Sequence, residues 1–134
     1  MPGIAARGVT LTGAGGAAIV NVTNISGPAL GLDTEDVTAH DSTDGWEEVV
    51  PTILRSGEVT LDINYDPAAA THKNAANGLL AIMLARTSAA WTFGGPMGAW
   101  SFSGFVTGFA PSAPHDGKLS ASVTIKPTGV ITIP

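Results

Sequence analysis

The sequence predicts a mainly β domain, an antiparallel β-sandwich or partial barrel with one flanking α-helix and a long loop after the first hairpin. Two segments, residues 57–66 and 118–126, alternate apolar and polar side chains with the period of a half-buried strand. The 17 Gly and 9 Pro suit short strands joined by turns. A chain of 134 residues has the length of one compact domain, so we expect a single unit over residues 1–134.

The first third of the chain predicts a hairpin followed by the long loop. Residues 7–13 and 17–25 are strand-like segments on either side of a glycine-rich turn. Residues 25–48 hold turn-forming and acidic residues with little periodicity, apart from a short strand near Val37. Loops of this length inside a compact domain usually serve a function or an interaction.

The clearest strand lies within residues 57–66, where two faces alternate strictly. The apolar face consists of Val59, Leu61, Ile63 and Tyr65, and the polar face consists of Glu58, Thr60, Asp62 and Asn64. We expect the apolar face to enter the core, which leaves the polar face accessible.

A single helix is predicted from Asp66 to about Arg86. Asp66 can cap free N–H groups, Pro67 fits the first turn, and Arg86 favours the C-terminal dipole. The apolar stripe that would pack on the sheet consists of Leu79, Leu80, Met83 and Leu84. The remaining chain predicts further strands over residues 88–93, 98–110 and 118–133.

The aromatic residues between positions 91 and 109 have two interpretations. They are Trp91, Phe93, Trp100, Phe102, Phe105 and Phe109. As a stacking platform they would hold bases or sugars, but no Lys or Arg lies between Arg86 and Lys118 to hold phosphates. Packing in the core or at a subunit interface is therefore the favoured interpretation.

The charge balance argues against nucleic-acid binding and for self-association. The net charge is -5, charged residues make up 13% and hydrophobic residues 44%, with a mean hydropathy of +0.27. A negative surface repels phosphates, and so little charge is unusual for a soluble monomer. Coverage by a partner or by further copies explains this composition.

Motifs for catalysis or cofactor binding do not emerge from the sequence. The acidic segment 33–48 suggests a metal loop, but Asp41 and Asp44 with Gly45 directly after do not have EF-hand spacing. GAGGAA at 13–18 lacks a phosphate-loop ending, and no serine lies in a GxSxG turn. We predict no enzyme activity and no catalytic, cofactor-binding or metal-binding residue.

Several short motifs, taken in order, resemble a known family. They are HDS at 40–42, GWE at 45–47, GEV at 57–59, NYDP at 64–67, GFVTGF at 104–109 and SVTIKPTG at 122–129. This order and spacing resemble the tail tube (major tail) proteins of long-tailed, non-contractile bacteriophages and of gene transfer agents. The resemblance covers about residues 34–129 and is most specific between Thr38 and Pro67.

The resemblance implies a structural virion protein without cofactors. Proteins of this kind form hexameric rings that stack into the tail tube, assembled in the host cytoplasm, through which DNA passes into the host without specific binding. It also implies tape measure, tail tip and tail terminator proteins as partners.

Two sets of site residues follow as hypotheses. Lumen-lining candidates are Glu58, Thr60, Asp62 and Asn64, whose carboxylates would repel DNA phosphates. Candidates for contact between stacked rings are Asp33, Glu35, Asp36, Asp41, Asp44, Trp46 and Glu47. Trp46 is either the apolar anchor of that contact or buried against its own sheet.

The alternative function is a monomeric β-sandwich module that binds carbohydrate or protein, such as a decoration domain. An enzyme with a metal in the 33–48 loop comes third, and a chelator-sensitive melting temperature would reveal it.

Overall fold

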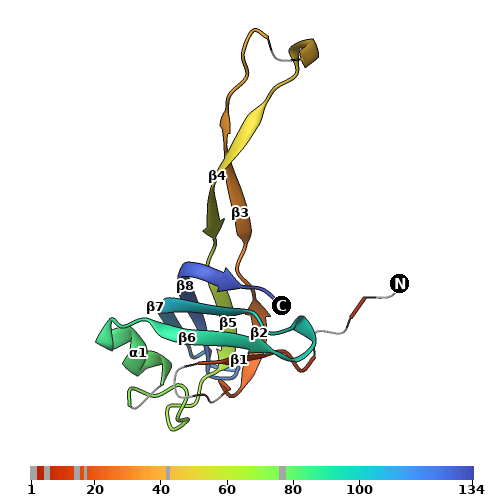
Figure 1. Ribbon diagram of the computed structural model, residues 1–134. Helices are drawn as coiled ribbons and strands as arrows, with labels where there is room; N and C mark the ends of the chain where they lie inside the picture. Colours follow the sequence, from red (N-terminus) through yellow and green to blue (C-terminus); the bar gives the residue numbers. More distant parts are fainter. Residues whose placement is uncertain (1–2, 5–6, 14–15, 17, 42, 76–77) are drawn as a thin grey trace.

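The computed structural model describes residues 3–4, 7–13, 16, 18–41, 43–75 and 78–134. It shows a barrel-like body from which one long hairpin projects (Figure 1). The elements are β1 (Thr10–Thr12), β2 (Val22–Ser26), β3 (Leu30–Asp36), η1 (Thr43–Gly45), β4 (Val49–Ser56), β5 (Val59–Asn64), α1 (Leu79–Ala85), β6 (Ala89–Gly94), η2 (Gly95–Met97), β7 (Ser101–Ser112) and β8 (Ser120–Thr132).

The body is a six-stranded antiparallel sheet in the order β1-β6-β7-β8-β5-β2, rolled until its two end strands approach each other. Residues 18–21 bridge the seam between these ends. Thr12 pairs with Ala18, Ile19 N donates to Leu11 O at 2.9 Å, and Asn64 N donates to Asn21 O at 2.8 Å. The predicted mainly β fold with a partial barrel and one helix is confirmed.

The core fills the inside of this rolled sheet. The inward residues of β5, which are Val59, Leu61 and Ile63, are buried as the alternation predicted. Trp91 and Phe93 of β6 are also fully buried, and Trp91 Nε1 donates to Gly104 O at 3.2 Å. Most of the aromatic group thus serves packing, although Phe105 remains 39% exposed.

The opening hairpin forms only in part. β1 pairs with β6 and β2 pairs with β5, so the two predicted hairpin strands become opposite ends of the sheet. Among the described residues of the two segments, Ala18 and Ile19 make the direct pairing contacts given above. Part of the expected turn, at residues 14, 15 and 17, lies outside the described residues.

The predicted long loop is wrong where a strand interrupts it. Residues 30–36 form β3, which pairs with β4 in a separate two-stranded sheet, and Val37 lies just beyond the strand. Neither face of this hairpin is buried, so the strand does not require apolar and polar side chains to alternate. The alternation that reveals a half-buried strand in a sequence is therefore absent. We call residues 30–56 the arm.

The predicted helix is also too long. It spans only Leu79–Ala85, and Asp66 caps a turn instead, accepting from Ala68 N at 2.9 Å. Gly78 is the N-cap of α1 in an extended conformation, and a Cβ there would collide with Lys73 O, so this close approach requires glycine. Residues 76 and 77 of the predicted helix lie outside the described residues. Leu79 and Ile82 face the core, whereas Leu84 of the predicted stripe is 60% exposed.

His72 ties the turns before the helix to the body. Its Nε2 lies 2.8 Å from Val20 O, and its Nδ1 accepts from Asp66 N at 3.3 Å. Thr71 Oγ1 accepts from Val20 N at 3.2 Å, so both backbone groups of Val20 are held. Among the helices in the described ranges, none is long and apolar enough to cross a membrane.

Candidate assembly surfaces

The arm exposes nearly every side chain that it carries. Of residues 30–56, excluding Ser42, which is not described, none is buried. Its exposed apolar residues are Leu30, Leu32, Val37, Trp46, Val49, Val50, Ile53 and Leu54. An isolated two-stranded hairpin is marginally stable in water, and exposed apolar surface of this extent marks an interaction site.

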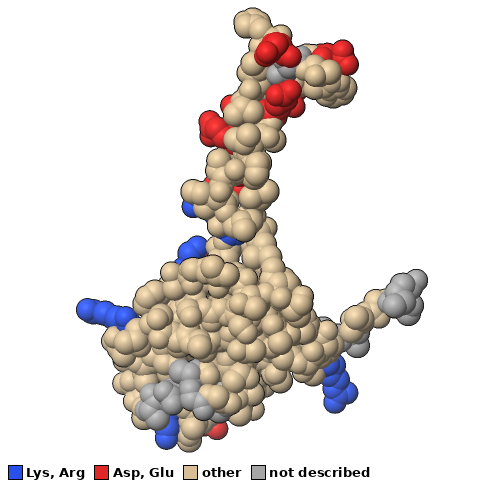
Figure 2. Space-filling view, viewed as in Figure 1, with Lys and Arg blue, Asp and Glu red and all other residues tan. Residues whose placement is uncertain are grey.

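The arm also concentrates the negative charge of the molecule. Seven of the eleven acids and one of the six basic residues lie in it, which gives a net charge of −6 on the arm and +1 on the rest of the chain. Figure 2 shows the acids gathered toward the outer half of the arm and most cations on the body. The negative charge is therefore concentrated on the arm, whereas the rest of the chain carries a small positive net charge.

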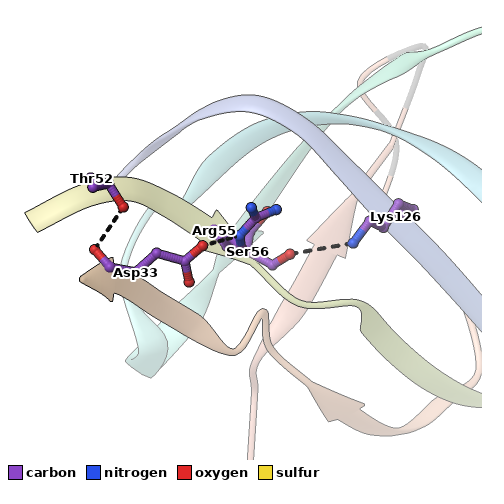
Figure 3. Close-up of polar contacts among 5 residues, drawn as sticks. All are labelled: Asp33, Thr52, Arg55, Ser56 and Lys126. Atoms are coloured by element: carbon purple, nitrogen blue, oxygen red, sulfur yellow. Dashed lines mark hydrogen bonds and ion pairs between the residues drawn. The ribbon is translucent and has the colours of Figure 1, made fainter. Parts of the chain in front are cut away.

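The root of the arm is held by polar contacts (Figure 3). Asp33 forms an ion pair with Arg55 and its backbone oxygen accepts from Thr52 Oγ1 at 3.1 Å. Lys126 Nζ of β8 donates to Ser56 O at 3.4 Å. The hydrogen bond and the charge of Asp33 raise the pKa of Arg55 from its ordinary value. The contacts of Asp33 join β3 to β4 within the arm, and the contact of Lys126 joins the arm to β8 of the body.

Thr38 joins the two sides of the arm near its outer end through hydrogen bonds with the backbone of Glu48. Its hydroxyl accepts from Glu48 N at 2.8 Å, and its backbone N–H donates to Asp36 Oδ1 at 2.8 Å. Hydrogen bonds from the Thr38 side chain and then its backbone lower the pKa of Asp36. Val37 N donates to Glu48 O at 2.9 Å, so strand-like pairing continues one residue beyond β3.

Trp46 is 75% exposed, which excludes burial against its own sheet. It follows the η1 turn, in which Asp44 and Gly45 have φ values of 55° and 71°, and its N–H donates to Thr43 O at 3.1 Å. This turn presents the indole at the end of the arm between acidic residues. A large apolar ring in that position is a suitable anchor for a partner.

All the residues expected to contact a neighbouring ring lie on the arm. Asp33, Glu35 and Asp36 lie on β3. Asp41, Asp44, Trp46 and Glu47 lie in the connection between β3 and β4, at the outer end of the arm. Across the ranges that the structure describes, no three His, Asp or Glu side chains gather as a metal-holding group.

The expected lumen-lining residues share one outward face of the barrel. Thr60, Asp62 and Asn64 are half-buried on β5, opposite Thr124, Ser122 and Ser120 of β8. Thr23 Oγ1 of β2 donates to Asp62 O at 3.1 Å. Glu58 lies exposed just before β5, next to the arm root. The result is a wall of small polar side chains with two carboxylates.

A groove on the body was not anticipated from the sequence. It has a volume of about 650 Å³ and lies where the chain before β1 separates from β2. Arg7 and Val9 form one side, Val22 and Ile25 the other, and Met97 of η2 closes it. Three segments distant in sequence build it, so no linear motif announces it.

Comparison with known proteins identifies solved structures with a similar fold. No protein family model matches this sequence, and no curated protein matches it as a relative. A chain in the virion of a native gene transfer agent particle matches with a TM-score of 0.80 and 14% identity over 97% of this chain and 98% of that chain. A chain in the tail of an empty gene transfer agent particle, refined with C6 symmetry, matches with a TM-score of 0.66 and 15% identity over 88% and 85%.

This chain shares its fold with chains of the gene transfer agent virion and tail. The same fold occurs in the sheath/tube terminator structure of PVC, an extracellular contractile injection system, with a TM-score of 0.69 and 13% identity over 99% of both chains. The matches span the body and arm together, so the arm belongs to the shared fold.

Proposed function

We propose that this chain is a structural tail tube subunit whose hexameric rings stack into a conduit for DNA. The observation that carries the proposal is the arm, which is ordered as a hairpin and buries no described side chain within its own chain. Such a hairpin needs a surface outside its own chain to cover it. The fold shared with chains of the gene transfer agent virion and tail supports further copies of the same chain as that surface.

We propose that the polar face of β5 lines the channel. Asp62 and Glu58 would repeat around each ring, and their negative charge would repel the phosphates of passing DNA. Thr60 and Asn64 on the same face add polar, uncharged surface. DNA would then slide along this wall without specific binding.

We also propose that the arm contacts the adjacent ring in the stack, with Trp46 as anchor. Burial of exposed apolar residues there would account for the low charge and positive mean hydropathy of the whole chain. The implied setting is a phage or gene transfer agent virion, assembled in the host cytoplasm, with tape measure, tail tip and tail terminator proteins as further partners.

Sedimentation velocity over a concentration series, with electron microscopy of the same samples, tests this function. The unaltered protein should form large hollow assemblies, whereas Trp46→Ala should remain a small folded species. Leu84→Ala is the matched control, because Leu84 is 60% exposed on α1 of the body. Both variants should melt at the temperature of the unaltered protein, since neither side chain is buried.

Normal tubes from Trp46→Ala would contradict the anchor role. A stable monomer of the unaltered protein at every concentration would favour the alternative, a decoration module that binds carbohydrate or protein, and a ligand screen would follow.

A further inference from the structure

We propose that the groove between the chain before β1 and β2 receives the arm tip, residues 43–47, of another copy of this chain. This inference rests on the proposed stacking and deepens it, because it names the surface on which the arm of the next copy docks. The argument has four parts: the shape of the groove, the shape of the tip, their charges, and the direction of the arm.

The groove is suited to an inserted segment. The two sides pair through Ile19 N and Leu11 O at 2.9 Å and then separate toward Arg7 and Ile25. Because β2 is an end strand of the sheet, the backbone groups on its outer side have no strand partner within that sheet. A volume of about 650 Å³ lies in the range of small-ligand sites and exceeds what one side chain needs.

The arm tip supplies a matching shape. The η1 turn is compact, and Trp46 projects from it with 75% of its surface exposed. The groove offers apolar walls to this ring through Val9, Ile25 and Met97. An exposed aromatic ring and a groove with both apolar and polar lining residues on the same molecule can form a self-complementary contact.

The charges of the two surfaces are opposite. Among the described residues that line the groove, Arg7 carries a charge and none is a carboxylate. Asp44 and Glu47 flank Trp46 at the tip. Two acidic arms repel each other, so the net charges of −6 and +1 favour the contact of an arm with a body over the contact of two arms.

The geometry requires the groove of a different copy. The arm extends away from the body, so its tip is remote from the strands that form its own groove (Figure 1). Gly57 N donates to Ala29 O at 2.7 Å at the root, and the strand pairing above it keeps the arm extended. A contact between two different patches is heterologous, and such contacts either close into a ring or repeat along an open stack; the proposed contact is of the second kind.

Cross-linking in a chain that has no native cysteine tests the contact directly. Glu47→Cys marks the tip, Thr23→Cys marks the groove wall, and Ser112→Cys, exposed at the end of β7, is the control. Equimolar mixtures are assembled and treated with a short bismaleimide. Glu47→Cys mixed with Thr23→Cys should give a cross-linked dimer, whereas Glu47→Cys mixed with Ser112→Cys should not.

A charge swap gives a second readout. Arg7→Glu should raise the concentration needed for half-assembly about tenfold, because it brings like charges together in the contact. Adding Glu47→Lys to the same chain should restore most of the loss, whereas Glu47→Lys alone should also weaken assembly. Melting temperatures identify any variant that fails to fold.

The outcomes separate this inference from the function on which it rests. Tubes that form without the cross-link between tip and groove, or with equal cross-linking to Ser112→Cys, would overturn the docking site and leave the tail tube function standing. Absence of any assembly by the unaltered protein would overturn the proposed function and this contact with it.

Discussion

At the scale of single residues, His72 has a role that its place in the sequence did not reveal. The sequence predicted it early in a helix, but the structure buries it completely and uses both ring nitrogens, toward Val20 O and Asp66 N. It therefore fixes the turns after β5 against the start of β2. Sequence gives no sign of this because its partners are backbone groups, which every residue carries.

We expect His72→Ala to lower the free energy of unfolding by about 2–4 kcal/mol, because a fully buried side chain leaves a cavity and two part-buried backbone groups lose their partners. Urea denaturation measures the loss. His115→Ala, in an exposed turn, should change the free energy of unfolding by less than about 0.5 kcal/mol. Equal midpoints for the two variants would show that the His72 contacts do not stabilise the body.

Asp36 should report the pairing at the outer end of the arm. Its pKa is lowered by hydrogen bonds from the Thr38 side chain and backbone. The stabilisation is therefore present above the unfolded-state pKa and is lost as the pH falls through the lower, folded value. An NMR titration should place the Asp36 midpoint below that of an ordinary aspartate, and Thr38→Val should move it upward. An unchanged midpoint in Thr38→Val would refute the assignment.

At the scale of elements, burial decides which strands the sequence reveals. β5 was predicted closely because one face enters the core and alternation follows from that burial. Residues 30–48 of the arm were interpreted as a loop because β3 buries neither of its faces, and Gly31 adds a turn-like signal. The predicted helix was too long because the His72 contacts that hold its first part in turns go to backbone groups and have no local signature. Gly78, directly before α1, is a local signal against a continuous helix.

The body should fold without the arm. The arm buries none of its described side chains, and Ala29 and Gly57 already meet at its root through a hydrogen bond of 2.7 Å. Replacing residues 30–56 with Asn-Gly should leave the melting temperature almost unchanged and abolish assembly. Calorimetry and sedimentation velocity measure the two effects. A large fall in melting temperature would show that the arm supports the body.

At the scale of the whole molecule, the uneven charge and the exposed apolar arm favour contacts with other molecules. The sequence anticipated the acids and Trp46 as contact candidates, because a large apolar ring in an acidic stretch is visible without a structure. It did not anticipate the groove, because Arg7, Ile25 and Met97 come together only when the sheet rolls up. The proposed tail tube function assigns both surfaces, the arm and the groove, to contacts between copies of this chain.

A three-dimensional electron microscopy reconstruction of the assembled protein tests the central claim most directly. The account predicts stacked six-fold rings around an open channel, with Asp62 and the polar face of β5 on the inner wall. A reconstruction without a channel would contradict the tail tube function. A channel with Asp62 on the outer surface would contradict the lumen assignment alone.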